Sequence, residues 1–114
     1  MIKWKEQMLR DFFLGVIKIH ILYHASRQEI YGLEMKEELE RHGYRISPGT
    51  LYPALHGLEA QKLLESRRAT IQGRVRRLYR VTAAGQQALE DAKEKIRELV
   101  GEILYEDQPP GEST

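Results

Sequence analysis

The sequence predicts a mainly α-helical fold with one small β-hairpin. Apolar residues recur at helical spacing in four segments, whereas alternation with a period of two marks the stretches on either side of Gln72-Gly73. The length of 114 residues fits one modest hydrophobic core. The expected order is therefore three helices, a two-stranded hairpin and a final helix.

The first predicted helix covers residues 7–26 and is apolar around much of its circumference. Such a broad apolar surface suggests burial on two sides, by the domain's own core and by a second surface. After a break at residues 26–30, a shorter amphipathic helix carries Leu33, Met35 and Leu39. It is expected to end at His42-Gly43, because glycine favours helix termination.

The third predicted helix has an unusual composition for an element that only stabilises a fold. It begins at Ser47-Pro48, a serine cap followed by a proline where no amide is needed. One arc is apolar and consists of Leu51, Ala54, Leu55 and Leu58. The opposite arc carries small or polar residues with Tyr52 at its flank: Gly49, Pro53, His56 and Gly57. Small residues on this arc allow the helix backbone to approach a large partner closely.

Residues 63–71 and 74–82 form the predicted hairpin. In the second strand Val75, Tyr79 and Val81 are expected on the core face and the even-numbered arginines on the outer face, although Arg77 and Leu78 interrupt the alternation. Net charge is only +1, yet the hairpin contains six arginines and no acid between Ser66 and Thr82: Arg67, Arg68, Arg74, Arg76, Arg77 and Arg80. A local basic stripe of this kind fits phosphate contact, with a solvated charged hairpin as the alternative.

The last predicted helix is capped by Thr82 and runs to about Tyr105. Its apolar positions are spaced three and four residues apart in a heptad-like seam: Leu89, Ala92, Ile96, Leu99 and Ile103. We expect this seam to contact a partner subunit, with packing on its own domain as the alternative. The expected organisation is residues 1–82 as the core domain, 83–105 as a dimerisation helix and 106–114 as a disordered tail.

This order of elements matches a helix-turn-helix followed by a wing. In that arrangement the third helix enters the major groove of double-stranded DNA, and the hairpin lies along the phosphate backbone or minor groove. Arginine suits the wing because its planar fork binds phosphate at two points. The predicted DNA contacts are Ser47, Thr50, Tyr52 and His56 on the helix, with Arg74 and Arg76 on the wing.

Residues 47–59 resemble the recognition-helix signature of the PadR family of transcriptional regulators, reading SPGTLYPALHGLE. Tyr31-Gly32 at the start of the second helix agrees, as does the stretch from Gly73-Arg74 to the YRVTAAG run that ends at Gly85. Together these pieces cover most of residues 8–105. In two places the chain departs from the family pattern: Gly57 replaces a usual basic residue, and Gln61-Lys62 replaces an acid-glycine turn, so the helix is expected to end differently.

The resemblance implies a homodimeric winged helix whose final helix packs against the first helix of the partner. It also implies a repressor that releases its DNA operator when a small organic effector binds or another cue arrives. The single final helix resembles the short branch of the family, with Leu89, Ile96, Leu99 and Ile103 at the dimer interface. An apolar or aromatic effector would then lie near Met8, Phe12, Val16, Ile96 and Val100, with plain dimer packing as the alternative.

Other classes of protein are disfavoured. The chain has no cysteine and no set of nucleophile, base and orienting group, so neither an enzyme nor a thiolate metal site is expected. His20 and His24 are one helical turn apart, but no third ligand is evident near them in the sequence, and neither a metal nor another cofactor is expected. The most apolar stretch is too short for a membrane span, and a cytoplasmic location is expected. The main alternative is a winged-helix protein-interaction module, which the arginine-rich hairpin argues against.

Overall fold

The computed structural model describes residues 3–105, with side chains from residue 6 onward, so the predicted tail lies outside the described residues. The elements follow one another in this order: α1 (Lys3–Arg27), β1 (Ile30–Tyr31), α2 (Gly32–Arg41), α3 (Pro48–Ala60), β2 (Leu64–Ile71), β3 (Arg74–Val81), α4 (Ala83–Val100) and a π-helical turn (Gly101–Tyr105). The predicted winged helix-turn-helix with a long C-terminal helix is confirmed. None of the described helices is long and apolar enough to cross a membrane.

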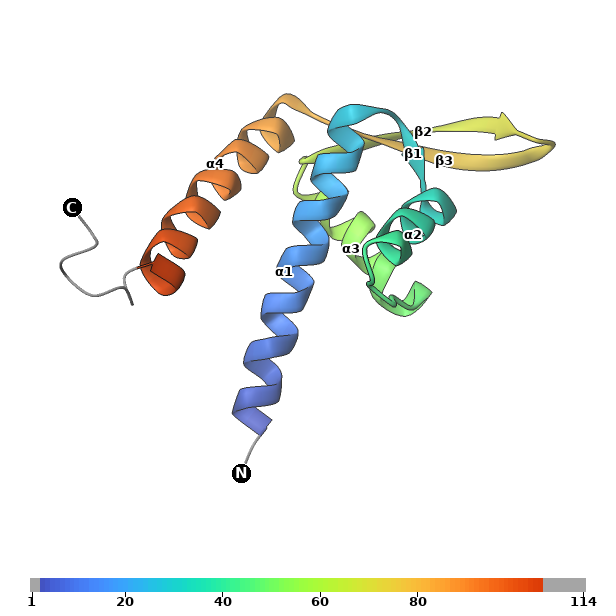
Figure 1. Ribbon diagram of the computed structural model, residues 1–114. Coiled ribbons are helices and arrows are strands. Elements are labelled where there is room, and N and C mark those ends of the chain that lie inside the picture. The colour runs from blue at the N-terminus through green and yellow to red at the C-terminus, as the bar shows by residue number, and fades with distance from the viewer. Residues whose placement is uncertain (1–2, 106–114) are drawn as a thin grey trace.

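A three-stranded antiparallel sheet with the order β1-β3-β2 lies at one end of α1 and α4 (Figure 1). The sequence predicted only the hairpin β2-β3, because the two residues of β1 are too few to show a periodic pattern. Ile30 and Tyr31 become a strand through pairing with Tyr79 and Leu78 of β3. Tertiary contact therefore decides the third strand.

The hydrophobic core forms where α1, α2 and α3 meet the base of the sheet and the start of α4. Its fully buried side chains come from all of these elements: Ile17, Ile21, Met35, Leu39, Leu51, Leu55, Leu64 and Leu89. The apolar arc predicted for α3 is buried, as expected. The second half of α1 belongs to this core, whereas its first half extends away from it (Figure 1).

Gln72 and Gly73 close the hairpin, with φ angles of 52° and 78° that suit a two-residue turn. The strands pair in register from Leu64 with Val81 to Ile71 with Arg74. Tyr79 is buried as predicted, but Val75 is 70% exposed, so its expected place on the core face was wrong. The reason is that the tip of the hairpin projects beyond the helices that cover its base (Figure 1).

The start of α4 is tied tightly to the sheet. Thr82 caps the helix by accepting a hydrogen bond from the Gly85 amide (3.0 Å), and its hydroxyl donates to the Lys62 carbonyl (2.7 Å). Gly85 is buried so close to the Leu63 carbonyl that a Cβ atom would collide with it. Glycine at this position thus allows α4 to join the domain core.

The end of α3 keeps the geometry that glycine would normally provide. Lys62 has a φ of 64°, in the left-handed region, and the Leu63 amide donates to the Leu58 carbonyl at 2.9 Å. Replacing the acid-glycine turn with Gln61-Lys62 was expected to change how the helix ends. The lysine instead adopts the left-handed conformation itself.

Candidate nucleic-acid interface

The outer face of α3 is open to solvent next to the hairpin. Tyr52 and His56 are exposed on this face, while Leu51 and Leu55 of the same helix are buried. Tyr52 and His56 line a groove of about 250 Å³ together with Arg76, Arg77 and other residues of the wing and of the start of α2. The predicted base-contacting helix and the arginine-rich wing therefore form the two walls of one groove.

Tyr52 is exposed in this groove and also packs against the start of α2. A Cβ atom at Gly32 would lie 2.7 Å from Cε1 of the tyrosine ring and 2.8 Å from its hydroxyl oxygen. The ring therefore rests directly on the backbone at the start of α2. This contact explains why α2 begins with a glycine, and it fixes the position of Tyr52 in the groove.

Ser47 and Thr50 do not face this groove. Ser47 is exposed at the N-cap of α3 and its hydroxyl lies 3.3 Å from that of Thr50. Thr50 is half-buried and lines a different groove, between α1 and α3. The structure thus separates the four predicted helix contacts into one pair beside the wing and one pair at the start of α3.

Hydrogen bonds join the wing to α3. The Ser66 hydroxyl donates to Oε2 of Glu59 at 2.6 Å, and the Arg77 guanidinium donates to the Ser66 oxygen at 2.9 Å. Glu59 is the last residue of the PadR-like run, and Ser66 and Arg77 lie on the two strands of the wing. The sequence did not predict this chain of hydrogen bonds, because a serine and a glutamate seven residues apart form no recognisable sequence pattern.

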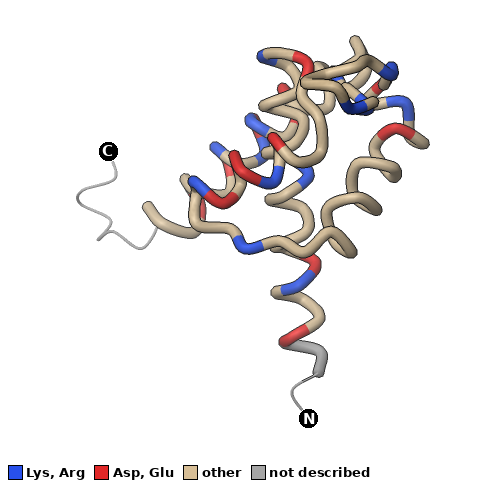
Figure 2. Tube along the Cα trace, turned by 90° about the vertical axis from the view of Figure 1, so that its right-hand side faces the viewer, with Lys and Arg blue, Asp and Glu red and all other residues tan. Residues whose placement is uncertain are grey.

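Basic residues recur along the hairpin (blue in Figure 2), but its six arginines differ in the partners of their side chains. Arg67 donates two hydrogen bonds to Glu29 (2.8 and 2.7 Å), which hold the pKa of that carboxyl below its usual range, and Arg80 pairs with Glu65 at 2.7 Å. Arg76 lies over the Tyr31 ring, 4.6 Å from its centroid. Within residues 6–105, Arg68 and Arg74 are exposed and form no ion pair.

Of the two wing arginines predicted to contact DNA, Arg74 is exposed, whereas Arg76 is half-buried against an aromatic ring. Arg68 was not singled out from the sequence. It is directly opposite Arg77 across the hairpin, on the same face as Tyr79. The signal that would have identified it is the strand register, which determines which arginines share a face.

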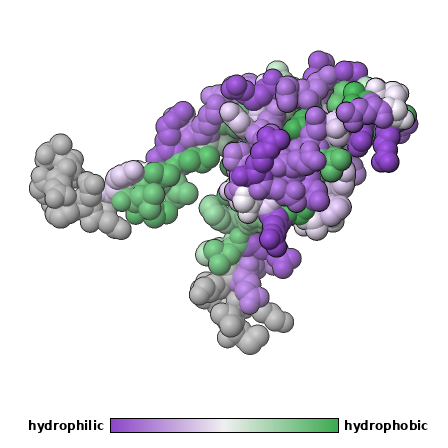
Figure 3. Space-filling model, turned by 45° about the vertical axis from the view of Figure 1, so that its right-hand side comes forward, coloured by the Kyte–Doolittle hydropathy of each residue, from purple (hydrophilic) through white to green (hydrophobic). Residues whose placement is uncertain are grey.

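Exposed apolar side chains are concentrated on the two helical arms that extend from the core. Figure 3 shows hydrophobic surface on the outer part of α4 and on the first half of α1. On α1 these side chains are Met8, Leu9 and Phe12, and at the C-terminal end they are Ile96, Leu99, Ile103, Leu104 and Tyr105. Leu89 is 1% exposed and belongs to the domain core, so its predicted place at a subunit interface was wrong.

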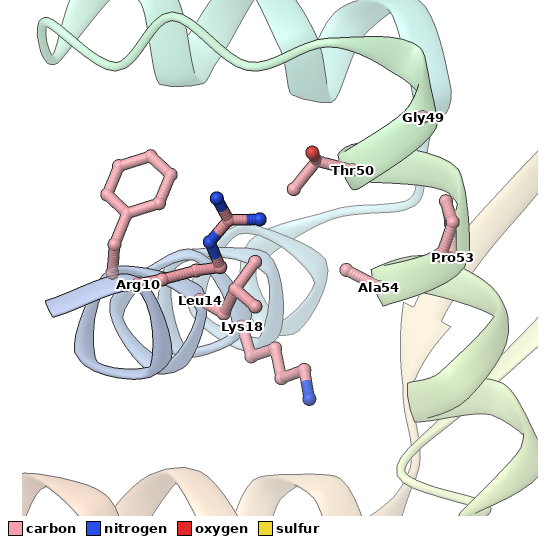
Figure 4. Close-up of a pocket in the computed structure, with 8 residues that line it drawn as sticks. Arg10, Leu14, Lys18, Gly49, Thr50, Pro53 and Ala54 are labelled. Carbon is pink, nitrogen blue, oxygen red and sulfur yellow. The ribbon is translucent and has the colours of Figure 1, made fainter. Parts of the chain in front are cut away.

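Two further grooves flank α1. One of about 310 Å³, between α1 and α4, is lined by Val16 and Ile96 but not by Met8, Phe12 or Val100 of the predicted effector set. A larger groove of about 450 Å³ lies between α1 and α3 (Figure 4). Arg10 and Lys18 of α1 line it opposite Thr50, and the Arg10 guanidinium points into the space between the helices.

Three histidines gather at the end of the groove between α1 and α4. The ring centroid of His20 lies 6.1 Å from that of His24 and 5.4 Å from that of His42. Burial is the main cause that lowers the pKa of both His20 and His24, and the neighbouring His42 lowers it further. Glu38 of α2 completes a group in which the ligand atoms of His24, Glu38 and His42 lie within 4.8 Å of one another. The sequence showed the first two histidines but not these α2 partners.

Comparison with known proteins agrees with this geometry. Residues 21–91 match the profile of the "Transcriptional regulator PadR-like family". The chain is 48% identical over 96 residues to the transcriptional regulator Rv3488 of Mycobacterium tuberculosis, covering 84% of this chain and 90% of that protein.

Two crystal structures of similar proteins also resemble the fold. A PadR family transcriptional regulator from Eggerthella lenta is 28% identical with a TM-score of 0.74, covering 90% of this chain and 94% of the other. A PadR-like transcriptional regulator from Bacillus cereus is 32% identical with a TM-score of 0.68, covering 87% and 97%. The chain therefore belongs to the PadR-like family of transcriptional regulators, which are not enzymes.

Proposed function

We propose that this regulator binds its operator as a homodimer and represses transcription, inserting α3 into the major groove and laying the wing on the phosphate backbone. The observation that carries the proposal is the groove in which Tyr52 and His56 of α3 face the arginine-rich wing. In such a geometry helix side chains meet base edges, while wing guanidinium groups contact phosphates without reading sequence. Arg68 and Arg74 are exposed wing residues whose charge no acid in the described part of the chain neutralises.

Two copies are needed because one winged helix covers only one half-site. The exposed apolar side chains of α1 and of the C-terminal end of α4 support a two-fold interface in which each copy covers the arms of the other. Ile96, Leu99 and Ile103 are the C-terminal positions that would be buried there. This arrangement would hold two copies of α3 at a fixed spacing on the DNA.

Binding to the DNA upstream of the regulator's own gene, compared with random duplex, tests the proposal. If the dimer neutralises about six to ten phosphates, affinity should fall about a thousandfold or more between 50 and 200 mM salt. Arg74→Ala should weaken binding to both DNAs alike. It should also reduce the slope of the logarithm of affinity against the logarithm of salt concentration by about one for each phosphate that is no longer neutralised. Arg67→Ala is the matched control, because Glu29 already neutralises this arginine. An absence of binding at low salt, or equal losses for both variants, would contradict the proposal.

Tyr52→Phe tests whether the helix reads sequence. This change keeps the ring that packs on Gly32 and removes only the hydroxyl, so the fold is preserved. Removing one hydrogen bond to a base edge should cost about 1 kcal/mol of operator affinity and leave random binding nearly unchanged. The proposed role fails if the ratio of operator to random affinity stays at the wild-type value.

The groove between α1 and α3 supports release of DNA by a small effector. Its walls combine the apolar Phe13 and Leu14 with the cationic Arg10 and Lys18, so it suits a small aromatic anion. A ligand here would contact Thr50 and so bear directly on the position of α3. Benzoate serves as a probe: it should lower operator affinity in the wild type and lose this effect in Lys18→Gln. Unchanged DNA affinity at millimolar benzoate and other aromatic acids would remove this part of the proposal.

A further inference from the structure

Two pairs of metal-ligating residues face each other from neighbouring helices. His20 and His24 are one turn apart on α1, while Glu38 and His42 are one turn apart at the C-terminal end of α2. Residues spaced by four project from the same side of a helix, so each helix offers two ligands to the space between them. Metal sites in helical proteins are built from side chains on facing helices in this way.

The distances fit an ion after a small contraction. The ligand atoms of His24, Glu38 and His42 lie within 4.8 Å of one another. A tetrahedral ion with bonds of about 2.0–2.1 Å requires ligand atoms about 3.4 Å apart. His42 is exposed at the C-cap of α2 and Glu38 is a long side chain, so rotamer changes supply the remaining movement.

One member of this group has a buried ring nitrogen without a partner. Nε2 of His24 is buried and has no hydrogen-bond partner among the described residues. A buried polar atom without a partner is unfavourable, and coordination of an ion would use its lone pair. Oε1 of Glu38 accepts a hydrogen bond from Arg41 at 2.6 Å, which orients the carboxylate and leaves its other oxygen for an ion.

We propose that His24, Glu38 and His42 bind one divalent transition-metal ion of the zinc class, with the fourth coordination position open to His20 or water. Two imidazoles and one carboxylate suit Zn²⁺ and its neighbours, whereas Mg²⁺ and Ca²⁺ require more oxygen ligands. The ion would tie α1, which carries the apolar arm, to α2, the first helix of the helix-turn-helix. This site is separate from the DNA-binding groove and from the groove that contains Arg10 and Lys18.

Calorimetric titration of the untagged full chain with ZnCl₂, in the absence of DNA, tests the proposal. The expected result is one Zn²⁺ per chain and a higher melting temperature in its presence. His24→Gln, Glu38→Gln and His42→Gln should each weaken binding at least about tenfold, because even residues that only orient ligands contribute that much. His42 is exposed, so its variant should keep the fold even if the change at His24 perturbs packing.

Two matched controls distinguish the site from general zinc adsorption. His56→Gln removes the fourth histidine of the chain, on α3, and Glu37→Gln removes the exposed carboxylate beside Glu38. Both should bind Zn²⁺ with wild-type affinity. No binding by the folded wild type would overturn the proposal, and so would equal losses in His42→Gln and His56→Gln. Either result would contradict only the metal site and not the proposed DNA binding, because the titration contains no DNA.

Discussion

The domain core and the two helical arms of this regulator both carry large apolar side chains, but these side chains differ in how far they are buried. In the core, α2, α3 and the second half of α1 bury side chains such as Ile21, Met35 and Leu55 completely. On the arms, Phe12 of α1 and Ile103 of the C-terminal turn remain 63% and 55% exposed. The core closes on itself within one chain, whereas the arms leave apolar surface for which the described part of this chain provides no cover.

This difference shows that one helix can belong to both regions. Leu89 lies in the core and Ile96, two turns later on α4, is 43% exposed. The boundary falls where α4 leaves the sheet, beyond the tight contact at Gly85 (Figure 1). The first part of α4 therefore stabilises the domain, and we infer that the second part serves assembly.

The largest expected effect comes from placing charge on the arm. Ile96→Asp combined with Leu99→Asp should turn the proposed dimer into a monomer, because two-fold symmetry doubles the effect of each substitution and a buried aliphatic side chain contributes about 1.5–3 kcal/mol. Operator binding should fall with it. Sedimentation of the wild type and of the variant measures the change, and the exposed charge pair Lys95→Glu and Glu98→Lys is the control. A wild type that is monomeric at micromolar concentration would refute the assembly role of the arm.

The second test compares a core leucine with an arm leucine. Leu55→Ala should lower the free energy of unfolding by about 2–5 kcal/mol, because its side chain is fully buried. Leu99→Ala should mainly raise the dimer dissociation constant, because its side chain is 47% exposed within one chain. Urea unfolding and sedimentation equilibrium of both variants separate the two quantities. The division fails if the two substitutions affect both quantities equally.

A smaller effect is expected at the boundary between the two regions. Gly85→Ala should destabilise the protein by about 1–3 kcal/mol, because the added methyl group meets the Leu63 carbonyl. Gly57→Ala is the matched helical control, since nothing lies within 4 Å of its Cβ position, and it should stabilise by about 0.5–1 kcal/mol. Thermal unfolding without DNA measures both. If the melting temperatures of both variants shifted in the same direction, the close packing of Gly85 against the Leu63 carbonyl would not be what positions α4.

The smallest predicted effect concerns the turn after α3. Lys62→Gly should raise stability by less than about 1 kcal/mol, because relief of the left-handed conformation is partly offset by the flexibility of glycine in the unfolded chain. Lys62→Ala keeps the strained conformation and should give no gain. Chemical denaturation of the two variants shows the difference. A loss of stability in the glycine variant would contradict the left-handed geometry.

Much of the fold follows from local rules that the sequence displays. The spacing of Leu51, Leu55 and Leu58 predicted the buried arc of α3, and the Gln72-Gly73 turn predicted the hairpin. Thr82 at the start of α4 was recognised as a cap. Each of these depends on residues close together in the chain, so periodicity and turn chemistry are sufficient to predict them.

Tertiary structure decided which side chains meet across the fold. The partners of the hairpin arginines depend on strand register and on Glu29, which is distant in sequence. The strand β1, the burial of Leu89 and the approach of Glu38 and His42 to His24 likewise depend on how α1, α2 and α4 pack. A sequence pattern reports which face of an element is apolar. It does not report which other element covers that face, because that contact joins residues whose separation along the chain carries no periodic signal.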